Sequence, residues 1–261
     1  MAQGILSEMT IEEVRAFDPE VVVLPIGSTE PHGPALPYGT DHFQGEAICR
    51  RGVGRANQKG ARALMYPPLP IGNNVNFKVW PFACRVRVQT LMQVVLDIIE
   101  AVEEDGIRKV VLFNSHGGNT DTLRATLRAH ADRHRPGEGA FVAMTSGMAA
   151  QAVRGEIIAH PSDHGGEAET SAVMYLRPEL VKEDKLANNP WGELAVEALS
   201  HEGVYFVRPW HLHVPASAGG EQRQSTPEKG EALIDASAEA LAELLVELSA
   251  AEFTEHFPFK K

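Results

Sequence analysis

The sequence is poor in the features that mark several large classes of protein. It has only two cysteines, Cys49 and Cys84, and no CxxC pair. A zinc ribbon and a thioredoxin-like motif are therefore excluded, and we expect two buried thiols. No apolar run approaches the roughly 18 residues that a transmembrane helix needs. The first ten residues have neither a basic start nor an apolar core, so we expect no signal peptide and a cytoplasmic protein.

Positive charge is also scarce. The 261 residues include 24 Lys and Arg against 35 Asp and Glu, which gives a net charge of -11. This balance disfavours nucleic acids and anionic membranes as partners. The absence of GxGxxG and Walker patterns gives little support to nucleotide binding. Hydrophobic residues at 43% and charged residues at 23% are typical of a globular protein.

The sequence does contain an alternation of apolar runs and helical patterns. Apolar runs, typical of strands buried on both faces, cover residues 21–26, 64–66, 110–113 and 141–145. Helical patterns cover residues 10–17, where Thr10 and Glu13 have capping-box spacing, and 43–56, 90–104, 119–134, 165–176 and 228–248. The alternation predicts an α/β fold: a single layered domain over residues 1–261 with a mostly parallel central sheet flanked by helices.

Polar side chains follow two of the predicted strands. Residues 27–41 read GSTEPHGPALPYGTD and hold Glu30, His32 and Asp41, and residues 114–119 read NSHGGN and hold His116. Because ligands bind beyond the carboxyl ends of strands in open α/β sheets, we expect both loops to face one crevice. Each residue alone is more typical of a loop or a surface. Together, carboxylates and imidazoles without cysteine favour a zinc, manganese or iron site.

A third cluster precedes a predicted helix. Residues 163–171 read DHGGEAETS and include His164, Glu167 and Glu169. Acidic residues are common in the first turn of a helix because they interact favourably with its dipole, so this segment alone indicates only a helix start. Beside the two loops, we interpret it as the remaining side of one site.

The three segments together resemble the motifs of the creatininase family of amidohydrolases. Residues 27–41 are similar to the family's GSxExHGPHLPxxTD, residues 114–119 to its NGHGGN, and residues 164–171 to its HAGxxETS. The motifs occur in the family's order, and the similarity runs from about residue 21 to residue 176. The resemblance implies a creatininase-like layered fold and a homo-oligomer such as a hexamer. It also implies hydrolysis of a cyclic amide, or of a related small polar cyclic substrate, by a metal-activated water.

The resemblance further implies two divalent metal ions per chain, with Zn, Mn or Fe as the candidates. By this comparison Asp41 would bridge the two ions. Glu30 and His116 would bind one of them, and His32 and Glu167 would bind the other.

Catalytic roles are implied for the third motif. His164 would be the general acid or base, because histidine titrates in the required range. Asp163 or Glu169 would hold its orientation.

The motifs define the substrate less well. Creatininase takes a metal-binding glutamate from the loop that here reads Gly117-Gly118, and this departure argues against creatinine. Two segments outside the motifs supply candidate substrate-binding residues, namely Asn74, Asn76, Trp80, Trp210 and His211. They favour a sugar-like or cyclitol-like substrate, although asparagines also form turns and tryptophans also pack in cores.

Other functions stay open. Within the family these are ring opening of an oxidised inositol by C–C hydrolysis, deformylation of a formamide, and trimming of a peptide-derived precursor. A different class is a non-catalytic metal-binding scaffold that has kept its ligands without turnover.

Overall fold

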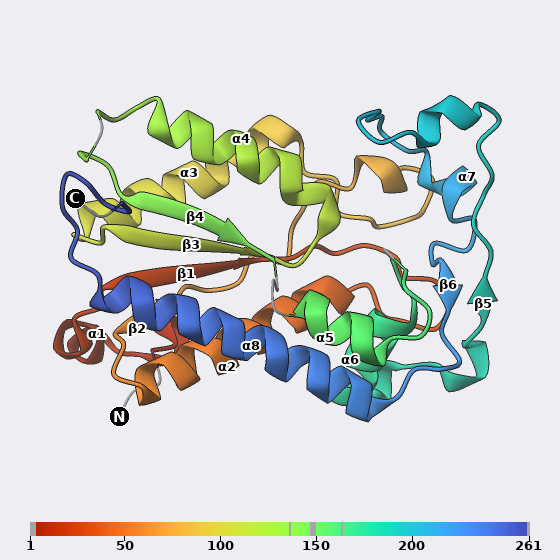
Figure 1. Ribbon diagram of the computed structural model, residues 1–261, viewed down its shortest axis with the longest axis horizontal. Coiled ribbons are helices and arrows are strands. Elements are labelled where there is room, and N and C mark those ends of the chain that lie inside the picture. The colour runs from red at the N-terminus through yellow and green to blue at the C-terminus, as the bar shows by residue number, and fades with distance from the viewer. Residues whose placement is uncertain (1–3, 136, 147–149, 163, 260–261) are drawn as a thin grey trace.

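A parallel sheet forms the centre of the protein. The computed structural model describes residues 4–135, 137–146, 150–162 and 164–259. Four parallel strands run in the order β2-β1-β3-β4 (Figure 1). They are β1 (Val21–Ile26), β2 (Ala63–Met65), β3 (Lys109–Asn114) and β4 (Phe141–Thr145). The mostly parallel sheet that the sequence predicts is confirmed.

Helices cover both faces of this sheet (Figure 1). On one face lie α3 (Val88–Glu104) and α4 (Thr120–Ala131). On the other lie α2 (Thr40–Gln58), α6 (Glu167–Leu176) and α8 (Pro227–Ala250), with α5 (Ala150–Ile157) packed beside α8. No helix in the described ranges is both long and apolar enough to cross a membrane.

The two apolar cores explain why the strand sequences are continuously hydrophobic. Successive residues of a strand point to opposite faces. Val21 and Val23 of β1 therefore join the core under α2 and α8, whereas Val22 and Leu24 join the core under α3. A strand covered on both faces needs apolar residues at every position.

The first helix, α1 (Ile11–Phe17), forms the predicted capping box. The Thr10 hydroxyl accepts the Glu13 N–H, and the Glu13 carboxylate accepts the Thr10 N–H at 2.7 Å. Asp18 ends the helix in the left-handed conformation. The two cysteines form no disulfide; Cys49 is buried, but Cys84 is only half-buried, which corrects the expectation of two buried thiols.

Several short elements were not expected from the sequence. They are α5, α7 (Trp210–His213), the antiparallel pair β5 (Asn188–Asn189) and β6 (Gly220–Glu221), and the 3-10 turns Leu6–Glu8, Val75–Phe77, Gly117–Asn119, Pro178–Leu180, Glu183–Lys185 and Glu197–Ser200. Elements this short have too few residues for a recognisable hydrophobic period. The segment that carries β5, α7 and β6 lies beyond the carboxyl ends of the strands (Figure 1).

The strand order creates a crevice between β1 and β3. From β1 the chain passes through α2 to β2 on one side, and β3 lies on the other side of β1. Ile26 and Asn114 are paired, so the loops after β1 and β3 leave the sheet side by side. The chain adds β2 on one side of β1 and then β3 on the other, so the direction of strand order changes at β1. Open α/β sheets bind their ligands at such a point.

Candidate metal centre

Four predicted metal ligands converge at this crevice. Glu30 and His32 follow β1, His116 follows β3, and Asp41 lies in the first turn of α2. None of the four is more than 6% exposed. Nδ1 of His116 lies 3.2 Å from Oε1 of Glu30 and 3.1 Å from Oδ2 of Asp41. These three residues form one group whose ligand atoms lie within 4.8 Å of one another.

A second group shares Asp41 with the first. Nε2 of His32 lies 3.3 Å from Oδ1 of Asp41 and 3.7 Å from Oε2 of Glu169. His32, Asp41 and Glu169 again offer atoms within 4.8 Å of one another. The two oxygens of one aspartate thus face two histidines on opposite sides.

Backbone carbonyls orient the three histidines of the cluster. One nitrogen of each ring lies within hydrogen-bond distance of a backbone carbonyl oxygen. Nδ1 of His32 is 3.1 Å from the carbonyl oxygen of Glu30. Nε2 of His116 is 3.2 Å from that of Asn73, and Nε2 of His164 is 3.0 Å from that of Pro31. A carbonyl accepts a hydrogen bond, so it fixes the proton of a neutral ring on that nitrogen. In that neutral form, the other nitrogen of each ring carries its lone pair toward the carboxylates and can bind a metal ion.

Burial and charge oppose each other in this cluster. Burial disfavours the cation of His32, but Asp41, Glu169 and Glu30 outweigh it and raise the pKa of His32 to about 10. Burial likewise disfavours the cation of His116, whose pKa is nevertheless raised well above its usual value by Glu30 and Asp41. The two histidines in turn hold the pKa of Asp41 well below its usual range in spite of burial. The carboxylates therefore favour positive charge at the centre.

Three atoms at the centre lack a hydrogen bond. Oε2 of Glu30, Nε2 of His32 and Oδ2 of Asp41 are buried and have no hydrogen-bond partner among the described residues. An unsatisfied buried polar atom costs about 1–3 kcal/mol. Oxygen and imidazole nitrogen are ligands of zinc and manganese, so the residues present fit divalent cations.

Glu167, a predicted ligand, is not brought to this cluster. Its buried carboxylate accepts from Lys229 Nζ at 2.5 Å and from the His160 N–H at 2.8 Å. Glu169, predicted as an orienting residue, lies at the cluster instead. Residues two apart on a helix point in nearly opposite directions, about 200° around the axis, so only one of these glutamates faces the site. That periodicity is the sequence signal that could have separated them.

His164, the predicted acid or base, lies beside the ligands. Its Nδ1 is 3.6 Å from Oε1 of Glu30, and its ring centre is 4.2 Å from that of His32. Burial, together with the charge of His32, lowers the pKa of His164 and outweighs the opposing carboxylates. The ring is therefore neutral near pH 7. Asp163, the alternative orienting residue, lies outside the described residues.

A cavity of about 410 Å³ opens onto Glu30, His116 and His164. Of the predicted substrate-binding residues, Asn76 and Trp210 lie in its wall. Oδ1 of Asn76 and Nε1 of Trp210 are buried and make no hydrogen bond within the described ranges. The wall also contains Asn73, Asp121, Tyr205 and Arg208.

The other three predicted substrate-binding residues lie outside this wall. The Asn74 amide donates to Oγ of Ser28 at 2.7 Å and to the carbonyl of Cys84 at 2.8 Å, so it braces the loop. Trp80 packs against the Phe77 ring, with 5.5 Å between ring centres. His211 is exposed on α7.

A family model described as Creatininase: Creatinine amidohydrolase matches residues 7–245. The chain belongs to the creatininase family. Two relatives illustrate the range of named activities. The mycofactocin precursor peptide peptidase of Mycobacterium ulcerans (strain Agy99) is 27% identical over 212 residues, which cover 79% of this chain and 78% of that protein. The creatinine amidohydrolase of Pseudomonas putida is 25% identical over 242 residues, covering 87% and 89%.

Solved creatininase structures share the fold. A protein of Bacteroides fragilis NCTC 9343, provisionally named creatinine amidohydrolase, has a TM-score of 0.86 at 27% identity, covering 97% of this chain and 100% of its own. A mutant creatininase of Zn-Zn type has a TM-score of 0.75 at 24% identity, covering 95% and 98%. A manganese creatininase has a TM-score of 0.74 at 23% identity, covering 95% and 99%.

One glycine in this creatininase-family chain holds the His116 loop in shape. A Cβ on Gly118 would lie 2.4 Å from Nε2 of His116 and 2.4 Å from the carbonyl oxygen of Asn73. Those are the two atoms whose contact orients the His116 ring. A glutamate at position 118 would displace that contact.

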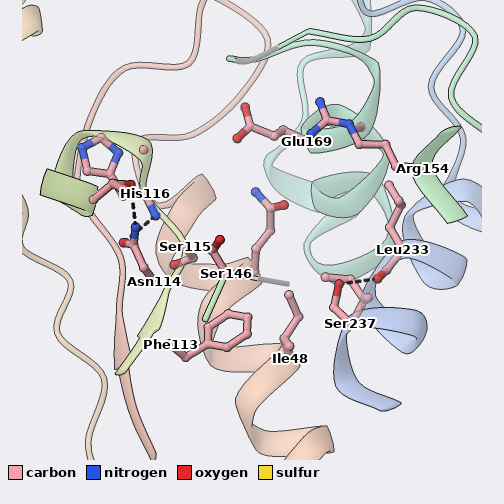
Figure 2. Close-up of a pocket in the computed structure, with 15 residues that line it drawn as sticks. Ile48, Phe113, Asn114, Ser115, His116, Ser146, Arg154, Glu169, Leu233 and Ser237 are labelled. Atoms are coloured by element: carbon pink, nitrogen blue, oxygen red, sulfur yellow. Dashed lines mark hydrogen bonds between the residues drawn. The ribbon is translucent and has the colours of Figure 1, made fainter. Parts of the chain in front are cut away.

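A second cavity, of about 300 Å³, borders the cluster through His116 and Glu169. Figure 2 shows Glu169 and Arg154 together toward the top of this cavity, with the apolar side chains of Phe113 and Ile48 toward the bottom. The Arg154 guanidinium donates to the carbonyl of Ser162. The creatininase-family cluster therefore lies between two cavities.

Proposed function

We propose that the chain is a hydrolase that holds two divalent metal ions and cleaves an amide or related bond of a small polar substrate with water. The observation that carries this proposal is the pair of ligand groups that share Asp41. Glu30 and His116 would complete one group, and His32 and Glu169 the other. A carboxylate with a histidine at each oxygen is suited to bridging two ions.

Zinc and manganese are the metals that the ligands favour. Three carboxylates and two imidazoles, with no thiolate, suit borderline and hard divalent ions. The Zn-Zn and Mn forms of solved creatininases support the same choice. Divalent ions held in this way lower the pKa of water toward neutrality and polarise a carbonyl group.

His164 is the residue that we propose to move protons. Its Nε2 proton is engaged by the Pro31 carbonyl, so Nδ1 is the basic atom and it faces Glu30. A neutral imidazole at this place accepts a proton from water and delivers it to the leaving nitrogen. This arrangement supports an enzyme over a non-catalytic metal-binding scaffold, because a neutral base beside the ligands is needed for proton transfer and is not needed to bind metal.

The substrate we propose is more polar than creatinine. The cavity that opens onto His164 has about 410 Å³ of space. In its wall, Oδ1 of Asn76 is an unpaired hydrogen-bond acceptor and Nε1 of Trp210 is an unpaired donor. Arg208 lies in the same wall and is positively charged. A buried site rich in polar atoms discriminates against ligands that leave them unpaired.

A second candidate is cleavage of an amide near the end of a peptide. Arg208 lies in the cavity wall, where its guanidinium could bind a terminal carboxylate. The 27% identical relative named a mycofactocin precursor peptide peptidase supports this candidate.

Metal analysis followed by a substrate panel tests the proposal. We expect about two zinc or manganese ions per chain and turnover of at least one member of a panel of cyclic amides, formamides, lactones, cyclic diketones and short peptides. Protein with no bound transition metal, in which zinc or manganese restores neither binding nor turnover, would overturn the proposal. Full metal content with no turnover of any amide would favour the scaffold.

A further inference from the structure

A second set of metal-type ligands lies at the opposite end of the sheet. It consists of Glu103 near the end of α3 and of His130 and His134 near the end of α4. Their ligand atoms lie within 4.8 Å of one another. The His130–His134 spacing of four residues places both imidazoles on one face of the chain as α4 ends.

The distances within this set suit a small cation. Nε2 of His130 lies 3.0 Å from Oε1 of Glu103, and Nε2 of His134 lies 3.7 Å from Oε2 of the same carboxylate. Ligands of tetrahedral zinc, each about 2.0–2.1 Å from the ion, are about 3.3 Å apart. The two nitrogen–oxygen distances, 3.0 Å and 3.7 Å, lie on either side of this ligand-to-ligand distance. Small rotations of the two imidazole rings would therefore place the three ligand atoms around one zinc ion.

The set is held in place by its surroundings. His130 is buried, and Nε2 of His134 is a buried atom without a hydrogen-bond partner in the described chain. Oε1 of Glu103 also accepts the Ala140 N–H at 2.5 Å, which fixes the carboxylate at the start of β4. A Cβ on Gly139 would lie 2.6 Å from the His134 ring, so only glycine lets the chain pass so close to that ring.

We propose that Glu103, His130 and His134 form a zinc site that is separate from the catalytic cluster. Two imidazoles and one carboxylate are a common zinc ligand set, and they leave the fourth position open. That position has room for a water molecule or a small anion, because His130 and His134 line a cavity of about 320 Å³. The bound ion joins the ends of α3 and α4 to the start of β4.

The site is independent of the proposed hydrolase activity. His116 follows the carboxyl end of β3, whereas Glu103 precedes its amino end. A six-residue strand separates the two ends by about 20 Å. Loss of one site therefore leaves the ligands of the other in place.

Binding of Co²⁺ and Zn²⁺ to full-length protein that carries Asp41→Ala tests the proposal. This background removes the ligand shared by the two catalytic groups but leaves Glu30, His32 and His164 close together. The comparison with and without His134→Gln therefore decides which set binds the ion, whatever the outcome for the proposed function. We expect Asp41→Ala protein to bind about one equivalent of Co²⁺ with the intense visible absorption of a four-coordinate site. Zn²⁺ at about 100-fold above its Kd should raise its Tm by about 5–10 °C.

Adding His134→Gln should remove both the absorption and the rise in Tm. Adding Glu103→Gln, which keeps an acceptor for Ala140, should weaken Co²⁺ binding at least tenfold. The matched control is His201→Gln, which removes an exposed histidine outside the ligand groups of the described residues. If the absorption and the Tm response were the same with and without His134→Gln, the set would be a hydrogen-bonded cluster and the proposal would be wrong.

Discussion

Oε1 of Glu167 lies 2.5 Å from Nζ of Lys229, so the first turn of α6 is joined to the first turn of α8. Glu167 is fully buried, whereas the Lys229 side chain is 26% exposed. Glu169, two residues later, points to the His32 ring instead. The two glutamates of one helical turn thus have separate tasks, one in packing and the other at the cluster.

Exchanging each glutamate for glutamine should separate these tasks. We expect Glu167→Gln to lower the free energy of unfolding by about 1–3 kcal/mol, because it leaves a weaker partner for Lys229, and to keep both metal ions. Glu169→Gln should keep the fold and lose about one of two ions. Urea unfolding and metal analysis of both variants measure this. Loss of metal from Glu167→Gln with a normal Glu169→Gln protein would reverse the assignment.

The stability difference between wild type and Glu167→Gln should depend on pH. Burial raises the pKa of Glu167, but the hydrogen bonds from Lys229 and the His160 N–H outweigh it and lower the pKa below its ordinary value of 4.5. A lowered folded pKa stabilises the fold above the ordinary value and loses that effect as the pH falls through the folded pKa. The difference should therefore be constant from pH 8 to about 5.5 and shrink below about pH 4.5. A difference that grows on acidification would contradict this interpretation.

Substitution of Asp41 should abolish metal binding and activity, whereas substitution of His164 should lower activity alone. Asp41→Ala removes the residue shared by both ligand groups, so we expect loss of both metal ions and of activity. His164→Ala should keep the metal and lower kcat about 10²–10⁴-fold, since it removes only the proposed proton-transferring group. Stoichiometric loss of metal from His164→Ala would make His164 a ligand, as its group with Glu30 and His32 would allow.

The fold was largely predictable because its signals are local. Each strand is a run of apolar residues, and the order of strands and helices predicts a parallel sheet. The loops that bring Glu30 and His116 together could be recognised because each follows such a run. The segment with α7 and the β5–β6 pair has no such period, so its place beyond the strand ends was not predictable.

Side-chain direction was harder to predict than position in the chain. Glu167 and Glu169 both belong to the third motif, and only the turn of α6 decides which of them reaches the cluster. Asn74 and Asn76 lie in one polar loop, yet the Asn74 side-chain NH₂ donates to Ser28 and Cys84 away from the cavity, whereas Asn76 lies in the cavity wall. Such differences depend on tertiary contacts that residue types alone do not reveal.

Self-association remains a prediction. Tyr205 and Val207, at the cavity wall, are 79% and 56% exposed, and Phe82 is 91% exposed. Apolar side chains so exposed favour burial against another subunit. Light scattering at micromolar concentration should give a mass of several chains, such as a hexamer, and Tyr205→Ser should lower it. A monomeric mass for the wild type would rule the oligomer out.

The last prediction concerns substrate choice at the cavity wall. Nε1 of Trp210 is an unpaired donor beside His164, so Trp210→Phe removes one donor and keeps a ring for packing. If the substrate accepts this donor, kcat/KM should fall about 5- to 150-fold, the equivalent of about 1–3 kcal/mol. Trp80→Phe is the matched control, since Trp80 packs against Phe77 outside the wall, and it should change kcat/KM less than twofold. Creatinine, a small planar molecule, should be turned over less efficiently than larger polar members of the panel that reach both the donor of Trp210 and the acceptor of Asn76. Equal efficiency for creatinine, or equal effects of the two tryptophan substitutions, would show that this wall does not select the substrate.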